Sequence, residues 1–212
     1  MTGKFITFEG PDGAGKTSVL SELVAKLAPK LGDKLVMTRE PGGNAISESI
    51  RQVILDVKNT AMDPRTEALL FAAARRQHIV ETIRPALSAN KIVFCDRFVD
   101  SSVAYQGAGR EIGTTEVYDM NLFATEGLVP DLTLYFDVPS EVGLNRIWEH
   151  RSDEVNRLDK DALEFHIRVR EAYLQQKELF AERIVTIDAT QPFEAVVADA
   201  LLAIKTRYPE LG

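Results

Sequence analysis

The chain has 212 residues, of which 45% are hydrophobic and 27% charged, and its formal net charge is −7. This length suits one well-buried core, and no Pro/Gly/Ser-rich linker or repeat divides the sequence, so a single domain over 1–212 is expected. The acidic balance argues against a nucleic-acid-binding surface, and neither a membrane-length apolar run nor a secretory signal is found, so we expect a cytoplasmic protein without membrane contact.

The first predicted elements are a strand, a glycine-rich turn and a helix. KFITF is typical of a buried strand, and SVLSELVAKLA places its apolar residues on one helical face. Between them, FEGPDGAGKTS fits the P-loop pattern G-x-x-x-x-G-K-[ST], in which backbone N–H groups and the start of the following helix bind phosphate. The predicted nucleotide-binding residues are Gly10, Pro11, Asp12, Gly13, Ala14, Gly15, Lys16, Thr17 and Ser18.

Two side chains of this loop carry specific chemistry. Lys16 would supply a mobile positive charge to the phosphates, and Thr17 would supply a hydroxyl to Mg²⁺. The alternative is a plain glycine turn, but at ordinary residue frequencies a chance match is rare, roughly under one in a hundred. The pattern therefore predicts a nucleotide phosphate site.

Four more apolar runs of strand length follow at KLVMT, KIVFCD, DLTLYFDV and RIVTID, with amphipathic helical segments between them. This alternation predicts an α/β protein of the P-loop NTPase fold, with a five-stranded parallel sheet and helices on both faces. Ligands of such sheets lie beyond the carboxyl ends of the strands. The site is therefore expected at Gly10–Thr17, Arg39–Gly43, Asp96–Arg97 and Asp188–Pro192.

Charged residues directly follow two of these strands. Asp96 stands where P-loop proteins place a carboxylate that holds Mg²⁺ or its water shell, although it could instead cap the next helix. Arg39 and Arg97 would face one crevice, and paired guanidiniums suit a phosphomonoester; surface ion pairing is the alternative.

Cys95 is expected in the core. His78 and the other two histidines show no metal-ligand spacing.

The segment LLFAAARRQH places Phe71 and Arg75 four residues apart, on one helical face. The ring could stack on a flat base while the guanidinium hydrogen-bonds the carbonyl edge of that base. Alternatively, Phe71 belongs to the core and Arg75 is a solvated charge.

Six segments in order resemble bacterial thymidylate kinase, and the resemblance covers almost the whole chain. They are FEGPDGAGKTS, TREPGG, LLFAAARRQH, DRFVDSSVAYQG, PDLTLYFDV and TIDATQP. The resemblance implies a homodimeric enzyme that moves the γ-phosphoryl group of ATP to dTMP, with Mg²⁺, to give dTDP and ADP.

The resemblance also implies roles for the dTMP-binding residues. It assigns Phe71 to stacking on thymine, Arg75 to thymine O4, Arg39 and Arg97 to the acceptor phosphate, and Asp12 to the sugar 3′-hydroxyl and the transfer zone.

Three residues of SSVAYQG complete this set. Ser102 and Gln106 would complete contacts to the base edge, and Tyr105 would crowd the 2′ position and favour deoxyribose, with core packing as its alternative role.

The second pKa of a phosphomonoester is about 6, so the acceptor oxygen is already ionised at neutral pH and needs no general base.

A second source of positive charge lies at about 145–160. The P-loop has Ala14 where some relatives carry a basic residue, whereas NRIWEHRSDEVNRLDKD offers Arg146, Arg151 and Arg157. This segment resembles the lid of the bacterial enzymes, although Asn156 replaces a usual aspartate; a charged amphipathic helix is the alternative. The predicted catalytic residues are Lys16, Asp12, Arg97, Arg151 and Arg157.

A nucleoside kinase and a GTP-driven switch are the two alternatives to this function. A nucleoside kinase needs a carboxylate base beside a neutral hydroxyl, and Glu40 or Asp12 could serve, but the crevice is rich in arginine. A GTP-driven switch needs N-K-x-D, and NKIV at Asn90 lacks the aspartate.

Overall fold

The computed structural model describes residues 3–150, 158 and 161–211. All five predicted strands are present, and they form one parallel sheet in the order β2-β3-β1-β4-β5. The strand that precedes the P-loop therefore lies at the centre of the sheet. The strands are β1 (Lys4–Glu9), β2 (Leu35–Arg39), β3 (Ile92–Asp96), β4 (Leu132–Asp137) and β5 (Ile184–Asp188).

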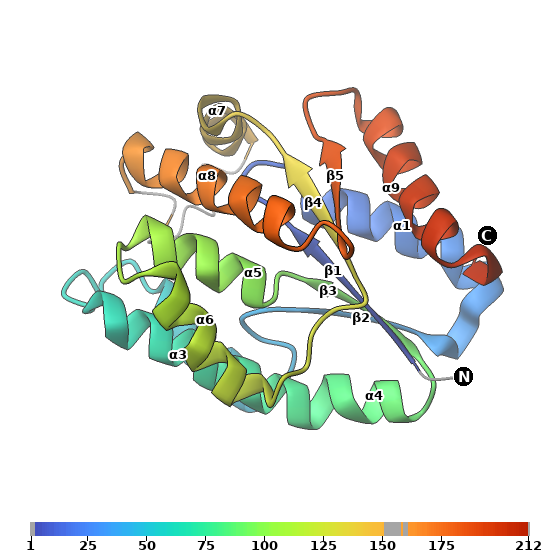
Figure 1. The fold of residues 1–212 in the computed structure, drawn as a ribbon, viewed down its shortest axis with the longest axis horizontal. Coiled ribbons are helices and arrows are strands. Elements are labelled where there is room, and N and C mark those ends of the chain that lie inside the picture. Colours follow the sequence, from blue (N-terminus) through green and yellow to red (C-terminus); the bar gives the residue numbers. More distant parts are fainter. Residues whose placement is uncertain (1–2, 151–157, 159–160, 212) are drawn as a thin grey trace.

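Helices cover both faces of this sheet, as predicted (Figure 1). On one face, α1 (Lys16–Leu31) and α9 (Phe193–Arg207) pack against each other. Leu20 and Leu23 of α1 and Ile204 of α9 are fully buried in the largest apolar cluster of the protein. Burial of an apolar side chain of this size contributes about 1.5–3 kcal/mol, so this face fixes the helix that follows the P-loop.

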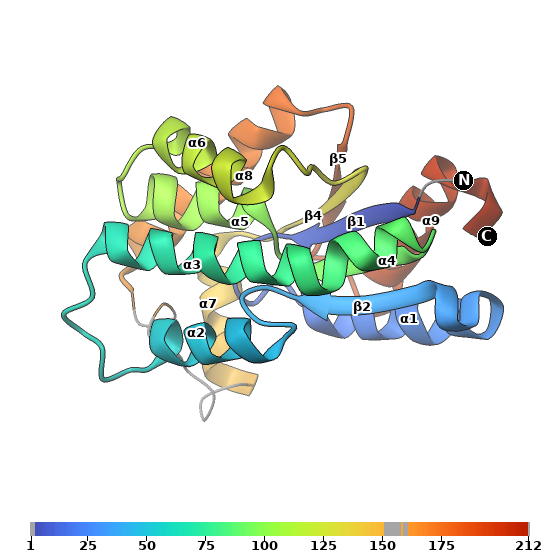
Figure 2. The same cartoon turned by 90° about the horizontal axis from the view of Figure 1, so that it is seen from below.

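The remaining helices lie on the other face and along its edges (Figures 1 and 2). The side chain of Asp63 caps the N-terminus of one of them, since it accepts hydrogen bonds from the N–H groups of Arg65 and Thr66. These helices are α2 (Ala45–Leu55), α3 (Pro64–His78), α4 (Arg84–Ser88), α5 (Val99–Ser102), α6 (Thr114–Thr125), α7 (Ser140–His150) and α8 (Leu163–Leu179).

Two π-helical segments interrupt the regular helices. The first, Ile79–Ile83, joins α3 to α4 in one long helical run, and the second, Val103–Gly109, continues α5. Segments of this kind are frequent at functional sites. The second segment contains Tyr105 and Gln106, two of the predicted substrate-binding residues.

The predicted lid at about 145–160 begins within α7. Arg151 and Arg157 fall outside the described residues, so their roles stay predictions. Among the helices that the structure describes, none has the length and apolar character needed to cross a membrane.

Candidate active site

A cavity of about 620 Å³ lies beyond the carboxyl ends of the central strands. The P-loop, the segments after β2 and β3, and side chains from α2, α3, α7 and the second π-helical segment surround it. Most predicted site residues meet here: Asp12, Gly13, Gly15, Lys16, Thr17, Ser18, Arg39, Phe71, Arg75, Asp96, Arg97, Ser102, Tyr105 and Gln106.

Some predicted site residues do not line the cavity. Gly10, Pro11 and Ala14 belong to the P-loop but are not among the described residues that face the cavity. The fourth predicted segment, Asp188–Pro192, does not line it either; there the Asp188 carboxylate accepts hydrogen bonds from the N–H and hydroxyl of Thr190. The cavity therefore joins three of the four predicted segments.

The P-loop has the backbone geometry that phosphate binding requires. Gly13 has a φ of +77°, and a Cβ there would lie 2.0 Å from the carbonyl oxygen of Gly143, so no other residue fits this position. Lys16 begins α1, and its ammonium donates to the carbonyl oxygens of Gly10 at 2.9 Å and Pro11 at 2.8 Å. Burial, together with the charge of Arg97, lowers the pKa of Lys16 to about 8. An anion in the loop would favour the charged form.

The predicted metal ligands contact each other. The Thr17 hydroxyl donates to Asp96 Oδ2 at 2.7 Å. Asp96 Oδ1 is buried and has no hydrogen-bond partner within residues 3–150, 158 and 161–211. A hydroxyl beside an unsatisfied carboxylate oxygen is a donor set that suits Mg²⁺, a cation that prefers oxygen ligands. These residues therefore fit the metal.

Arg97 and Asp12 form an ion pair at the wall of the cavity, with 2.5 Å between Nη2 and Oδ1. The Tyr105 hydroxyl donates to the other Asp12 oxygen at 2.6 Å, and the guanidinium lies 4.9 Å from the centre of the Tyr105 ring. Burial would raise the pKa of Asp12, but the charges of Arg97 and Lys16 outweigh it and hold this pKa at about 2. Asp12 is therefore an anion at neutral pH.

A buried polar group contacts the other terminal nitrogen of Arg97. Arg97 Nη1 donates to Ser101 Oγ at 3.1 Å, and the Ser101 hydroxyl donates to Glu9 Oε2 at 2.5 Å. The hydroxyl of Tyr173 also donates to Glu9, at 3.0 Å. Burial and the charge of Asp100 raise the pKa of Glu9 to about 7. The guanidinium is thus held by Asp12 directly and is linked to Glu9 through Ser101.

The other predicted phosphate-binding arginine lies at the rim. Arg39 pairs with both carboxylate oxygens of Glu48, at 2.8 and 3.1 Å, and 47% of its side chain is exposed. Arg51, which the sequence analysis did not select, also lines the cavity and donates to the carbonyl oxygen of Pro41 at 3.0 Å. Both arginines line the cavity, and burial together with the charge of Arg39 lowers the pKa of Arg51.

Arg75 is almost completely buried, at 2% exposure, and still lines the cavity. Its Nε donates to Glu40 at 2.7 Å, Nη1 donates to Ser102 and Asn121, and Nη2 donates to the carbonyl oxygen of Phe98. A guanidinium has five N–H groups. One Nη2–H therefore donates to none of the residues that the structure describes.

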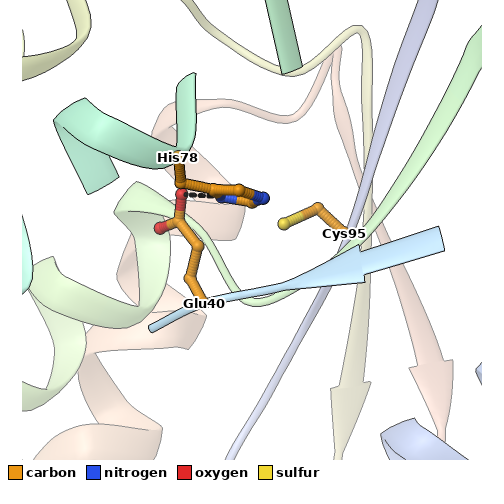
Figure 3. Close-up of side chains that lie close together, drawn as sticks. All are labelled: Glu40, His78 and Cys95. Atoms are coloured by element: carbon orange, nitrogen blue, oxygen red, sulfur yellow. Dashed lines mark hydrogen bonds and ion pairs between the residues drawn. The ribbon is translucent and has the colours of Figure 1, made fainter. Parts of the chain in front are cut away.

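Glu40, His78 and Cys95 come within 4.8 Å of one another, a grouping that could in principle hold a metal (Figure 3). Their polar atoms are already engaged, however. Glu40 accepts from Arg75 and contacts His78 Nδ1 at 3.0 Å, and the other ring nitrogen contacts Thr38 at 2.6 Å. Burial and the charge of Glu40 raise the pKa of Cys95 well above its usual range, so the thiol is protonated. The group supports Arg75 through Glu40.

The comparisons with known proteins agree with this geometry. A family model described as thymidylate kinase matches residues 8–200. A thymidylate kinase from Latilactobacillus sakei is 66% identical over 204 residues, covering 96% of this chain and 95% of that protein. One from Lactiplantibacillus plantarum is 64% identical, with coverage of 99% and 95%. The chain belongs to the thymidylate kinase family.

A crystal structure of thymidylate kinase from Ehrlichia chaffeensis shares the fold, with a TM-score of 0.78, 32% sequence identity, and coverage of 97% of this chain and 99% of that one. The predicted family, enzyme class and P-loop NTPase fold are thus confirmed.

The residues that support the predicted site could not be recognised from the sequence. Glu9, Ser101 and Tyr173 come from three distant segments, and no spacing in the sequence links them. Arg51 had a signal in the sequence, because it lies on the helical segment that follows TREPGG, a segment expected at the site.

Proposed function

We propose that this protein transfers the γ-phosphoryl group of ATP to dTMP, giving dTDP and ADP, inside the described cavity. One observation carries the proposal: a P-loop and a pocket with an aromatic ring, a buried guanidinium and further arginines open into the same space. Such an arrangement places a triphosphate and a nucleoside monophosphate end to end.

The donor site comprises the P-loop from Gly10 to Ser18. Its N–H groups and the N-terminus of α1 hold the ATP phosphates, and Lys16 moves from the carbonyl oxygens of the loop to these phosphates. Thr17 and Asp96 would hold the Mg²⁺, which would offset the negative charge of the phosphates.

The acceptor site lies between α3 and the second π-helical segment. Phe71 stacks on thymine, and the remaining Nη2–H of Arg75 donates to thymine O4. Arg97 binds the acceptor phosphate, with Arg39 and Arg51 supplying further charge from the rim. Ser102 holds the Arg75 guanidinium at 2.9 Å.

Tyr105 and Asp12 face the sugar. The Tyr105 ring is buried against Phe165 and Tyr173, and its hydroxyl is fixed on Asp12. Core packing and substrate contact, the two alternatives weighed from the sequence, are therefore compatible. A rigid ring at the 2′ position leaves no room for the hydroxyl of a ribonucleotide.

The transfer step needs positioning rather than proton removal. An ionised oxygen of dTMP forms a bond to the γ-phosphorus, the bond from that phosphorus to the β–γ bridging oxygen breaks, and ADP leaves with the electron pair. Lys16 and Arg97 offset the repulsion between the two anions. We also assign Arg151 and Arg157, within the segment at about 145–160 of the single domain, to the charge of the transferred group.

Metal binding gives a direct prediction. Asp96→Asn removes the charge from the unsatisfied carboxylate beside Thr17, so the Mg²⁺ concentration for half-maximal activity should rise about 10- to 100-fold. A Mg²⁺ titration of initial rates at saturating ATP and dTMP measures this. Asp188→Asn, at the end of β5, is the control and should leave the titration unchanged. An unchanged titration in Asp96→Asn would remove Asp96 from the metal site.

We further propose that two copies of the chain pair through α3 and α6, which pack side by side (Figure 2). Both helices leave large apolar side chains exposed, and Phe123 reaches 89% exposure. Large exposed apolar groups on a folded surface mark protein interfaces. The exposed residues of this surface are Leu69 of α3, Val80 of the first π-helical segment, and Leu122 and Phe123 of α6.

The dimer is tested with Phe123→Glu, because a charge at the centre of an apolar interface opposes association. Light scattering after gel filtration should give twice the monomer mass for the wild type and the monomer mass for the variant. Leu202→Glu, on the exposed side of α9, is the control and should remain dimeric. A monomeric wild type would refute the proposed pairing.

The acceptor chemistry is tested with a panel of dTMP, the matching ribonucleotide and thymidine, measured by ADP release. The proposal expects dTMP to be the best acceptor and thymidine, which lacks the phosphate, to be inactive. Phosphorylation of thymidine at the rate of dTMP would instead indicate a nucleoside kinase.

A further inference from the structure

The side-chain amide of Gln106 has a fixed direction. Gln106 lines the cavity at 1% exposure, and its Nε2 donates to Glu67 Oε1 at 2.9 Å. The amide oxygen is therefore on the opposite side of the amide group, and it receives no hydrogen bond from the part of the chain that the structure describes. An acceptor oxygen is thus available to a ligand in the cavity.

Glu67 is itself held in place from a second direction. It lies on α3 at 1% exposure, and Arg110 Nε donates to its two oxygens at 3.2 and 3.3 Å. Arg110 also pairs with Asp161 at 2.8 Å, and its guanidinium lies 4.6 Å from the centre of the Phe165 ring.

The same oxygen, Glu67 Oε1, accepts from both the Gln106 amide and the Arg110 guanidinium. Because both partners are donors, the amide nitrogen of Gln106 has to face Glu67. If the amide turned over, two acceptor oxygens would face each other in a buried place, which is unfavourable because neither can donate. The contact therefore fixes which end of the amide faces the cavity.

The geometry points to Glu67 as a positioning residue that sets base specificity, an inference that rests on the proposed function. Thymine and uracil carry an N3–H donor beside the O4 acceptor. Gln106 Oε1 accepts from N3–H while Arg75 donates to O4. Cytosine has an acceptor at N3 and an amino donor at C4, so it opposes both groups. Glu67 thereby prevents the amide from turning to suit cytosine.

We expect the loss of Glu67 to weaken the discrimination between dTMP and dCMP and to leave phosphoryl transfer itself largely intact. In Glu67→Ala, the Gln106 amide can turn over, so the ratio of kcat/KM for dTMP to kcat/KM for dCMP should fall at least tenfold. Most of the change should appear in KM, because the amide contacts the base and not the transferred phosphoryl group. dUMP, which shares the N3–H and O4 of thymine, should follow dTMP.

The experiment measures kcat and KM for dTMP, dUMP and dCMP in the wild type, Glu67→Ala, Glu67→Gln and Asp63→Ala, with thermal unfolding of each. Glu67→Gln keeps an acceptor oxygen for both donors, so it should restore discrimination. Asp63→Ala removes the cap of the same helix, and it should lower the melting temperature without changing the ratio. If Glu67→Ala does not fold, Glu67→Asp withdraws the oxygen from Gln106 and carries the same expectation.

A folded Glu67→Ala or Glu67→Asp with the wild-type ratio of dTMP to dCMP would overturn the inference. If the proposed function itself is wrong, the wild type will not phosphorylate dTMP, and this result is distinct from an unchanged ratio in the variants.

Discussion

Replacing Arg97 with alanine is expected to lower kcat/KM for dTMP by about 10³, near the lower end of the range for arginines that neutralise a transferring phosphoryl group. The variant loses the cation that faces the acceptor phosphate. It also leaves Asp12, which is paired with Arg97 at 2.5 Å, as an uncompensated anion where a second anion must bind. Initial rates over a range of dTMP concentrations at saturating ATP and Mg²⁺ measure the loss.

The matched control is Arg207→Ala. Arg207 makes two hydrogen bonds to carbonyl oxygens, those of Asp131 and Glu182, but it lies at the end of α9 and outside the cavity. This variant should keep kcat/KM within a few-fold of the wild type. If Arg97→Ala did the same, Arg97 would have no part in binding or transfer.

The second large effect concerns stability. Arg75→Ala should lower the free energy of unfolding by about 3–5 kcal/mol, because it leaves the Glu40 carboxylate, which is 2% exposed, as a buried charge without its partner. The acceptor oxygens of Asn121 and Phe98 lose their donor as well. Urea denaturation followed by far-UV circular dichroism measures the change.

Arg76→Ala, at the next position of α3, provides the comparison. Arg76 pairs with Glu126 at the surface, where 39% and 53% of the two side chains are exposed, so its removal should cost about 1 kcal/mol or less. Adding Glu40→Gln to Arg75→Ala should recover part of the lost stability, since it removes the unpaired charge. Equal losses in Arg75→Ala and Arg76→Ala would show that the buried pair contributes nothing beyond a surface pair.

The sheet and the donor side of the site could be predicted because their signals are local. Each strand is a short apolar run, and the P-loop is contiguous, so Lys16 and Thr17 needed no tertiary information. Asp96 and Arg97 were predictable because the end of a parallel strand indicates the edge of the sheet where ligands bind. The structure brings Thr17 and Asp96 into contact, although 79 residues separate them.

The supporting residues could not be predicted, because their partners are far apart in the sequence. Glu9 and Tyr173 are 164 residues apart, and Glu40 and His78 are 38 residues apart. Spacing rules describe one helix or one strand, and here each contact joins different elements. For the same reason, the sequence indicated Arg39 as a phosphate ligand but did not show that Glu48 pairs with it.

We propose that one cavity brings the terminal phosphate of ATP to the phosphate of dTMP. The most direct test incubates the wild type with Mg²⁺, dTMP and ATP labelled at the γ-phosphate, and then separates the nucleotides. We predict that the label appears at the β-phosphate of dTDP and that ADP forms in equal amount. Label found as inorganic phosphate, with dTMP unchanged, would contradict the claim.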